Sequence, residues 1–238
     1  MKRKTETKPF VSCIIAAGGR GSRMGADVNK IFLEFGGKPV LAHTLLAFEN
    51  CPAISEIIIV AAECDMLGCS DIARDFGISK LKTITKGGEL RQDSVRNGLA
   101  EISAYSDVVL IHDAARPLVT EGVIFGVIDG VLENRAAATG VQCKNTLKVA
   151  DEQGFIMDTP DRSHLFEIQT PQGFEPSLII RAHEDAKNSG IVATDDCFLV
   201  ERLGVSVKIT DGDYKNIKIT TPEDLPLAEL FLHTKEAL

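Results

Sequence analysis

A short apolar strand that runs directly into a glycine-rich loop limits what this chain can fold into. Residues 11–17 carry apolar side chains on both faces and are followed at once by Gly18 and Gly19. A strand of this kind is typical of a parallel sheet that is covered by helices on each side. Similar apolar runs lie at residues 57–61 and 108–111, and weaker ones lie at 136–141 and 205–210. The sequence therefore predicts a mostly parallel sheet.

Helical patterns lie between the predicted strands. Pro39 can open a helix whose apolar side chains continue to Phe48. The sequence Thr-Pro-Glu-Asp at residues 221–224 is a capping signal for a last helix over 225–232. Further apolar stripes at helical spacing occur at Val95, Leu99 and Ile102, at Val123, Val127 and Val131, and at residues 178–186. The alternation predicts an α/β fold, a Rossmann-like sheet with helices on both faces, in one domain over residues 1–238.

Residues 145–170 break this alternation. Short extended runs at 146–149 and 155–157 flank a turn-like sequence at 151–154. This is the pattern of a β-hairpin, and an isolated two-stranded hairpin is at most marginally stable in water. We therefore expect an extended β-hairpin arm that packs on another surface, such as a second subunit.

Composition narrows the classes of function. The chain has 238 residues and a formal net charge of −8, so neither nucleic acid nor a membrane is an expected partner, because both require a basic surface. The six cysteines form no C-x-x-C pair and are expected to be reduced and structural. Residues 1–8 do not have the pattern of a signal peptide, and the cytoplasm is the expected compartment.

The loop after the first strand carries the strongest chemical signal. Gly18, Gly19 and Gly21 let backbone N–H groups approach phosphate oxygens, and Arg23 and Lys30 add two cations. The glycine spacing matches neither a P-loop nor a dinucleotide fingerprint. Cations within the loop suit a triphosphate and a transition state that carries extra negative charge. The alternative is an ordinary strand-to-helix turn with solvated basic side chains.

A second glycine pair follows a weak strand at residues 82–85. Gly87 and Gly88 precede Arg91 and Ser94 at a predicted helix start. Backbone groups of such a loop can contact a nucleobase edge while the serine hydroxyl forms a hydrogen bond. A capped helix without a ligand would give the same pattern.

A carboxylate motif ends the strand at 108–111. Asp113 lies where ligand sites of open α/β sheets gather, and it can hold Mg²⁺ against phosphates or bind sugar hydroxyls. A structural ion pair between Asp113 and Arg116 is the alternative. Lys218 lies in a short extended segment before the last helix. The role of residues 194–196 stays open, because Thr194 is also a good helix N-cap.

In this order, the motifs resemble those of the 2-C-methyl-D-erythritol 4-phosphate cytidylyltransferase family of the non-mevalonate isoprenoid pathway. The resemblance covers about residues 11–232. The family motif A-A-G-x-G-x-R-M is similar to residues 17–24, with Gly18 in place of the second alanine, and Lys30 falls on the catalytic lysine. Asn29 and Ile31 replace the proline and glutamine that are common around that lysine. Further matches are G-G-x-x-R-x-x-S at 87–94, H-D-A-A-R-P at 112–117, T-P-Q at 170–172 and N-I-K at 216–218.

The resemblance implies a nucleotidyltransferase-type fold and transfer of CMP from CTP to 2-C-methyl-D-erythritol 4-phosphate, with Mg²⁺ or another divalent cation as cofactor. It implies catalytic roles for Arg23, Lys30 and Lys218, and a metal contact at Asp113. It implies CTP binding by Ala17, Gly18, Gly19, Gly21, Arg23, Lys30, Gly87, Gly88, Arg91, Ser94, Asp113 and Ala114. It implies binding of the polyol phosphate by Asp113, Arg116, Thr146, Arg162, Thr170 and Lys218.

The resemblance also implies a homodimer. The arm at residues 145–170 would cross to the neighbouring subunit and place Thr146 and Arg162 in the partner's site. A ribitol 5-phosphate cytidylyltransferase, or another polyol-phosphate nucleotidyltransferase, is the nearest alternative. A Rossmann-type dehydrogenase and a non-catalytic nucleotide-binding module are alternatives from other classes. Cations within the glycine loop argue against the first of these, and the joint presence of Arg23, Lys30 and Lys218 argues against the second.

Overall fold

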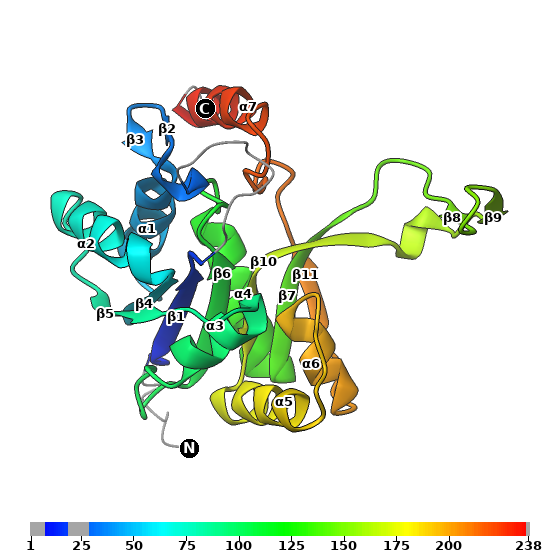
Figure 1. Ribbon diagram of the computed structural model, residues 1–238, viewed down its shortest axis with the longest axis horizontal. Helices are drawn as coiled ribbons and strands as arrows, with labels where there is room; N and C mark the ends of the chain where they lie inside the picture. The colour runs from blue at the N-terminus through cyan, green and yellow to red at the C-terminus, as the bar shows by residue number, and fades with distance from the viewer. Residues whose placement is uncertain (1–7, 19–28, 237–238) are drawn as a thin grey trace, which may run out of the picture.

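A seven-stranded sheet forms the centre of the computed structural model, which describes residues 8–18 and 29–236 (Figure 1). The strand order is β11–β7–β10–β6–β1–β4–β5. β10 runs antiparallel to β6 and β7, and all other neighbouring pairs are parallel. This confirms the predicted α/β fold with a mostly parallel sheet. The strands are β1 (Val11–Ala16), β4 (Glu56–Ala61), β5 (Leu81–Lys86), β6 (Val108–Asp113), β7 (Ala136–Gln142), β10 (Phe166–Phe174) and β11 (Lys208–Asp211).

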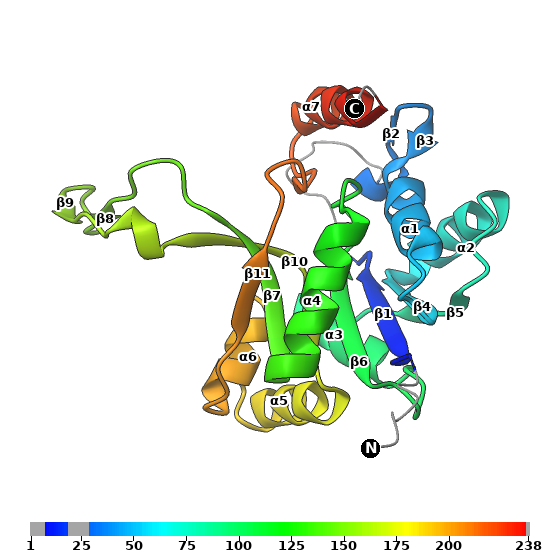
Figure 2. The same cartoon turned by 180° about the vertical axis from the view of Figure 1, so that it is seen from behind.

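Helices cover both faces of this sheet, as the two opposite views show (Figures 1 and 2). Cys13 and Ile15 of β1 pack with one set of helices, whereas Ile14 points to the other set. This two-sided burial explains why the strands are apolar at successive positions. The first set is α1 (Val40–Asn50), α2 (Met66–Asp75) and α4 (Glu121–Asn134), and the second is α3 (Arg91–Leu99), α5 (Pro176–Asn188) and α6 (Asp196–Arg202).

The last helix, α7 (Asp224–Glu236), lies beside the small β2–β3 hairpin (Glu34–Phe35 and Lys38–Pro39). The predicted capping signal forms as expected at its start. The Asp224 carboxylate accepts hydrogen bonds from the N–H groups of Thr220 and Thr221, at 2.7 and 2.9 Å. These bonds also fix the segment that follows Lys218.

β10 is the largest difference from the predicted fold. Its sequence contains Pro171 and Gly173, both of which argue against a central strand. A Cβ at position 173 would lie 2.6 Å from Val127 of α4, so only glycine fits between strand and helix. Pairing on both edges overrides the local propensity. Residues 166–170, which the sequence assigned to the arm, therefore belong to the main sheet.

Three smaller corrections concern the helices and the edge strand. Neither α2 nor α6 was predicted. α6 has only seven residues, whereas α2 carries an apolar stripe at helical spacing, including Cys69 and Ala73, which the sequence analysis overlooked. The N-cap of α6 is Asp195 rather than Thr194, since the Asp195 carboxylate accepts the Phe198 N–H at 3.0 Å. The edge strand expected at 205–210 is β11, at Lys208–Asp211.

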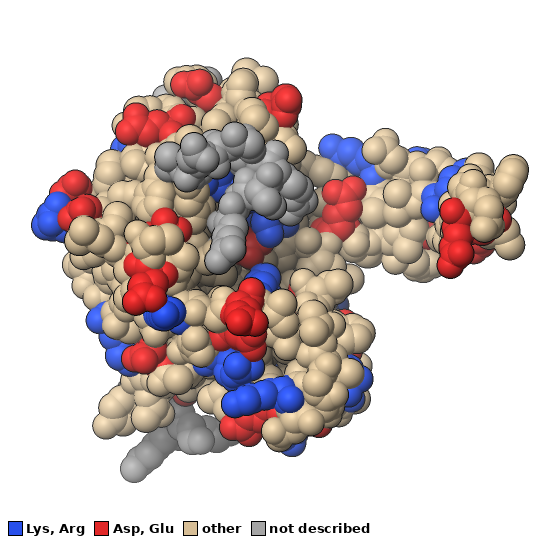
Figure 3. Space-filling model, viewed as in Figure 1, with Lys and Arg blue, Asp and Glu red and all other residues tan. Residues whose placement is uncertain are grey.

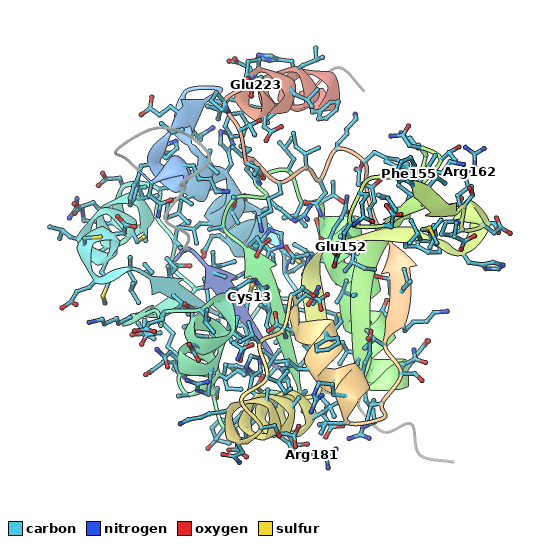
Figure 4. All side chains as sticks on the ribbon, turned by 45° about the vertical axis from the view of Figure 1, so that its right-hand side comes forward. Cys13, Glu152, Phe155, Arg162, Arg181 and Glu223 are labelled. Atoms are coloured by element: carbon cyan, nitrogen blue, oxygen red, sulfur yellow. The ribbon has the colours of Figure 1, made fainter. Side chains whose placement is uncertain are left out.

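The arm, now defined as residues 145–165, projects from the body in both views (Figures 1 and 2). β8 (Val149–Ala150) and β9 (Ile156–Asp158) form the predicted hairpin near its end. Its apolar side chains are largely in solvent, and Phe155, Ile156 and Met157 are 71%, 63% and 68% exposed. Figure 4 shows Phe155 and Arg162 on the arm, beyond the edge of the sheet. Exposed apolar groups of this kind are frequent at interaction surfaces.

Candidate functional site

The two predicted glycine motifs meet around one serine side chain. Ser94 is buried in the first turn of α3. A Cβ added to Gly18 would lie 3.5 Å from the Ser94 hydroxyl oxygen, and one added to Gly87 would lie 2.8 Å from it. The Ser94 hydroxyl accepts the Gly88 N–H at 3.1 Å and lies 3.2 Å from the Leu90 carbonyl oxygen, to which it donates. The serine therefore joins the loop after β1 to the loop after β5.

Gly18 and Gly88 differ in how tightly they are packed, so the same substitution by alanine should have different effects on stability at the two positions. Alanine at position 88 would overlap the Asp93 Cβ and lie 3.2 Å from the Asp93 carbonyl carbon. We expect Gly88→Ala to lower the free energy of unfolding by about 1–3 kcal/mol. Among the described residues a Cβ at Gly18 would come no closer than 3.5 Å to another atom, and Gly18 is not in the left-handed region, so Gly18→Ala should be neutral or stabilising by up to about 1 kcal/mol. Urea denaturation compares both variants with the parent, and equal losses would contradict this account.

Ala17 and Ala114, at the ends of β1 and β6, are held in place by backbone hydrogen bonds. The Ala17 N–H donates to Val60 at 2.8 Å, and the Ala114 N–H donates to Ala16 at 3.0 Å. The Thr44 hydroxyl of α1 donates to the Ala114 carbonyl oxygen at 2.7 Å. These bonds fix the carboxyl ends of neighbouring strands at one edge of the sheet.

Asp113 ends β6 among three cationic side chains. Lys218 Nζ lies 2.7 Å from Asp113 Oδ2, Arg91 Nε lies 3.4 Å from Oδ1, and Arg116 Nε lies 4.0 Å from Oδ2. Burial alone would raise the pKa of this carboxyl, but Lys218, Arg91 and Arg116 hold it well below its usual range. Asp113 is therefore ionised at neutral pH, in a site with more positive than negative groups.

Arg116 is more than the structural partner of Asp113. Its Nη1 donates to the Asn216 carbonyl oxygen at 2.8 Å, while its buried Nε has no hydrogen-bond partner among the described residues. Asn216 in turn donates to the Thr170 carbonyl oxygen at 2.9 Å. The segment that carries Lys218 is thus held against the strands that carry Arg116 and Thr170.

Behind Asp113 lies a buried network that includes Asp196, a residue whose role the sequence analysis did not decide. Arg91 Nη1 lies 2.7 Å from Asp196 Oδ2, and His183 Nε2 lies 3.1 Å from Asp196 Oδ1. Asp196 and His183 are almost fully buried. Arg91 therefore links the carboxylates of Asp196 and Asp113. The double aspartate at 195–196 hinted at this site, but no sequence signal pointed to His183.

His112 and Thr170 support the Asp113 backbone through a chain of hydrogen bonds. The Asp113 N–H donates to the Thr170 hydroxyl at 3.0 Å, and that hydroxyl donates to His112 Nδ1 at 3.1 Å. His112 Nε2 lies 3.0 Å from the Arg116 carbonyl oxygen, which can only accept. This network is satisfied by a neutral imidazole with its proton on Nε2. Burial lowers the pKa of His112 from 6.5 to about 4.

This shift predicts a pH dependence of stability. Since the folded-state pKa of His112 lies below the unfolded value, the unfolded chain binds the proton first as the pH falls below 6.5. We expect His112 to account for a loss of about 2 kcal/mol in the free energy of unfolding between about pH 7.5 and about pH 5. Denaturation curves of wild type and His112→Gln should differ in slope against pH over this range, whatever their absolute stability. Identical slopes would contradict a buried, neutral His112.

The remaining predicted residues fall into two groups. Lys30 is buried at the start of η1 (Lys30–Phe32), directly after Asn29. Asn29 has φ −62°, a value that a proline would also adopt, so the backbone at this position is compatible with the family's proline. Thr146 and Arg162 lie on the arm, and Arg162 donates to the Lys144 carbonyl oxygen at 3.0 Å. Gly19, Gly21 and Arg23 lie outside the described residues.

Two hollows lie near this edge of the sheet, and one of them is lined by residues of the cationic cluster. That hollow, of about 260 Å³, is lined by Arg116, Lys218, Glu167, Gln169, Tyr214 and the apolar side chains Val141, Ile168 and Ile217. The other, of about 490 Å³, lies at the base of the arm. Figure 3 shows that basic and acidic side chains are interspersed on the visible face. The smaller hollow presents the two cations Arg116 and Lys218 beside apolar side chains and one carboxylate, Glu167. Cations can bind a phosphate group and a carboxylate can accept hydrogen bonds from hydroxyl groups, so this lining suits a small phosphorylated polyol.

Metal and membrane features are sparse in the described part of the chain. No group of three or more His, Cys, Asp or Glu side chains gathers there as a metal site. Asp113 is a single carboxylate, and Mg²⁺ often needs only one or two carboxylates when phosphates and water supply its other ligands. No helix within residues 8–18 and 29–236 combines the length and the apolar character that crossing a membrane requires.

Comparisons with known proteins agree with this geometry. The family described as "IspD: 2-C-methyl-D-erythritol 4-phosphate cytidylyltransferase" matches residues 11–234. A 2-C-methyl-D-erythritol 4-phosphate cytidylyltransferase from Caldanaerobacter subterraneus subsp. tengcongensis is 50% identical over 223 residues, which are 93% of this chain and 98% of that protein. The protein of the same name from Clostridium perfringens strain 13 is 49% identical over 225 residues, with 93% and 98% coverage.

Solved structures give the same result. The 4-diphosphocytidyl-2C-methyl-D-erythritol synthase of Anaerococcus prevotii superposes with a TM-score of 0.85 at 34% identity, covering 95% of this chain and 97% of its own. The 2-C-methyl-D-erythritol 4-phosphate cytidylyltransferase of Thermus thermophilus has a TM-score of 0.75 at 30% identity, with coverage of 93% and 98%.

Proposed function

This chain belongs to the 2-C-methyl-D-erythritol 4-phosphate cytidylyltransferase family, and on that premise we propose that it transfers CMP from CTP to 2-C-methyl-D-erythritol 4-phosphate. The products are 4-diphosphocytidyl-2-C-methyl-D-erythritol and pyrophosphate. The observation that supports this most is the cluster of Lys218, Arg116 and Arg91 around the ionised Asp113, at the sheet edge where β1 and β6 end. That cluster offers positive charge for two anionic substrates at once.

The reaction needs no general base. A phosphate oxygen of the polyol substrate is already anionic and attacks the α-phosphorus of CTP in line. A new P–O bond forms as the bond from the α-phosphorus to the bridging oxygen breaks, and its electron pair leaves with pyrophosphate. The barrier therefore lies in bringing two anions together and in stabilising the charge that develops.

The protein's cations supply this stabilisation in our proposal. Arg23 and Lys30 contact the triphosphate, and Lys218 contacts the α-phosphate during transfer. Asp113 holds the Lys218 ammonium in place at 2.7 Å until substrate phosphates bind. Gly18, Gly87, Gly88 and Ser94 surround the base and sugar. Arg116, which lines the smaller hollow, faces the polyol, and the buried Thr170 acts on it through the Asp113 backbone that it holds.

Asp113 fits a divalent cation that is held mainly by triphosphate oxygens. When bound, Mg²⁺ would neutralise charge on the triphosphate and on the leaving pyrophosphate. Asp113 is the protein group that would face it, and its ionised state suits that role. Asp113 is also beside Lys218 and Arg91, so the carboxylate would be shared between protein cations and the metal.

We further propose a cytoplasmic homodimer in which the arm completes the partner's site. The exposed apolar side chains near the arm's end require a cover, and a second copy of the chain offers one. Thr146 and Arg162 would then contact the substrate bound by the partner. In the single chain Arg162 lies on the arm, outside the body of the sheet (Figure 4).

Substrate selectivity tests the proposed function. Because cytosine and uracil differ in donor and acceptor at one edge, a pocket that hydrogen-bonds to cytosine leaves groups unpaired with uracil. We expect kcat/KM for CTP to exceed that for UTP by at least about tenfold, with methylerythritol phosphate preferred over ribitol 5-phosphate. Pyrophosphate release measures all four combinations. Equal use of CTP and UTP would refute the cytosine pocket, and a preference for ribitol 5-phosphate would reassign the polyol.

A further inference from the structure

Asn29 connects three segments through one side chain. Its Nδ2 donates to Asp65 Oδ2 at 2.8 Å and to the Ala17 carbonyl oxygen at 3.3 Å. Its Oδ1 accepts the Ile31 N–H at 3.3 Å. Ala17 follows β1, Asp65 ends η2 (Glu63–Asp65) after β4, and Ile31 lies in η1. The amide thus ties the start of η1 to the end of β1 and to η2.

The Asn29–Asp65 contact is the strongest of these bonds. A hydrogen bond to a carboxylate is shorter and stronger than one between neutral groups. Its length of 2.8 Å lies in that class, whereas the other two bonds of Asn29 are 3.3 Å. Asp65 is held in turn by backbone, since its N–H donates to the Ala62 carbonyl oxygen at 2.9 Å. The carboxylate is therefore an anchor on the β4 side.

This anchor acts on the residue that follows. Asn29 is the N-cap of η1, and Lys30 is the first residue of that turn. Lys30 is buried, so its ammonium can reach only a limited region, and the backbone position at 29–31 sets that region. A displacement of about 1 Å at a catalytic group can cost on the order of 10²-fold in rate.

We propose that Asn29 and Asp65 are positioning residues for Lys30, an inference that rests on the proposed catalytic role of Lys30. Neither side chain need contact the substrates. The amide and the carboxylate fix the turn that carries Lys30, and they do so through a donor–acceptor pair that can be reversed. The reversed pair provides the test.

A charge swap separates positioning from general stability. Asn29→Asp sets two carboxylates against each other and should lower kcat about tenfold or more, with KM for the polyol phosphate unchanged. The double variant Asn29→Asp/Asp65→Asn restores the donor–acceptor pair between positions 29 and 65, and the carboxylate at position 29 can still accept the Ile31 N–H. It loses only the longer bond to the Ala17 carbonyl oxygen, at 3.3 Å. It should recover kcat to within about threefold of wild type. Asn188→Asp, at an exposed helix end, is the control for the charge change.

A double-mutant cycle that combines Asn29→Asp with Lys30→Ala provides a second test of the positioning role. If Asn29 acts through Lys30, then Asn29→Asp should change the single-turnover rate by less than about twofold in a Lys30→Ala background. A full tenfold loss in that background, or a double swap no more active than Asn29→Asp, would overturn the positioning role. Melting temperatures of all variants exclude unfolding as the cause. A wild-type protein that releases no pyrophosphate from CTP and methylerythritol phosphate would instead refute the proposed function itself.

Discussion

Replacing Lys218 with alanine is expected to lower kcat by about 10²- to 10³-fold while the protein stays folded, as for removal of one group that stabilises a transition state. The Lys218 side chain is 40% exposed, so the core does not depend on it. After its removal Asp113 keeps Arg91 and Arg116 as partners, and the buried carboxylate is not left uncompensated. The measurement is turnover at saturating CTP and polyol phosphate, together with a thermal melt.

A surface lysine provides the control for this loss. Lys208→Ala, on the exposed edge strand β11, removes the same charge at a distance from the proposed machinery. It should keep turnover within about twofold of wild type. If Lys218→Ala is folded and retains more than about a third of wild-type turnover, Lys218 does not stabilise the transition state in the way proposed.

Asp113 shows why the centre of the site could be predicted from the sequence. Its position follows from a local rule, because a carboxylate after a buried parallel strand lies at the edge where ligands bind. The glycine pairs could be recognised for the same reason, since close backbone approach requires them. At Gly87 the close neighbour in the structure is a protein side chain, because a Cβ there would lie 2.8 Å from the Ser94 hydroxyl oxygen, and the contact with a nucleobase stays a prediction.

Asp196 and His183 are residues that local sequence rules could not place in the site. Their contacts join segments that are distant in sequence, from Arg91 on α3 to His183 on α5. No local spacing encodes such a network, because the sheet topology brings its members together. β10 was missed for a related reason: it is defined by pairing with β6 and β7 and not by its own residues.

The second large expected effect is a loss of activity when the arm is altered. Its pattern in mixed dimers distinguishes an active site built from two subunits from one built within a single chain. Arg162→Ala removes the guanidinium that we place on the partner's substrate, and Lys218→Ala removes the ammonium at the chain's own Asp113. Both homodimers should be nearly inactive. Arg162 is exposed, so its loss should not affect folding.

The heterodimer of these two variants gives the decisive comparison. If the arm acts on the partner, one site collects both lesions, because the Lys218→Ala body receives the arm that lacks Arg162. The other site then has an intact Lys218 and an intact arm. Since only one of the two sites is whole, the mixed dimer should show about half the wild-type activity.

An arm that served its own chain would give the opposite result. Each site of the mixed dimer would keep one lesion, and activity would stay at the level of the inactive homodimers. Differently tagged subunits, co-expressed and purified over both tags, provide the mixed species without contamination by either homodimer.

Recovery of activity must also depend on dimerisation. Phe155→Ser, at an apolar position that is 71% exposed on the arm, should therefore weaken assembly and activity together. A wild-type protein that is monomeric and fully active at assay concentration would exclude the shared site, since no partner would then be present to supply Arg162.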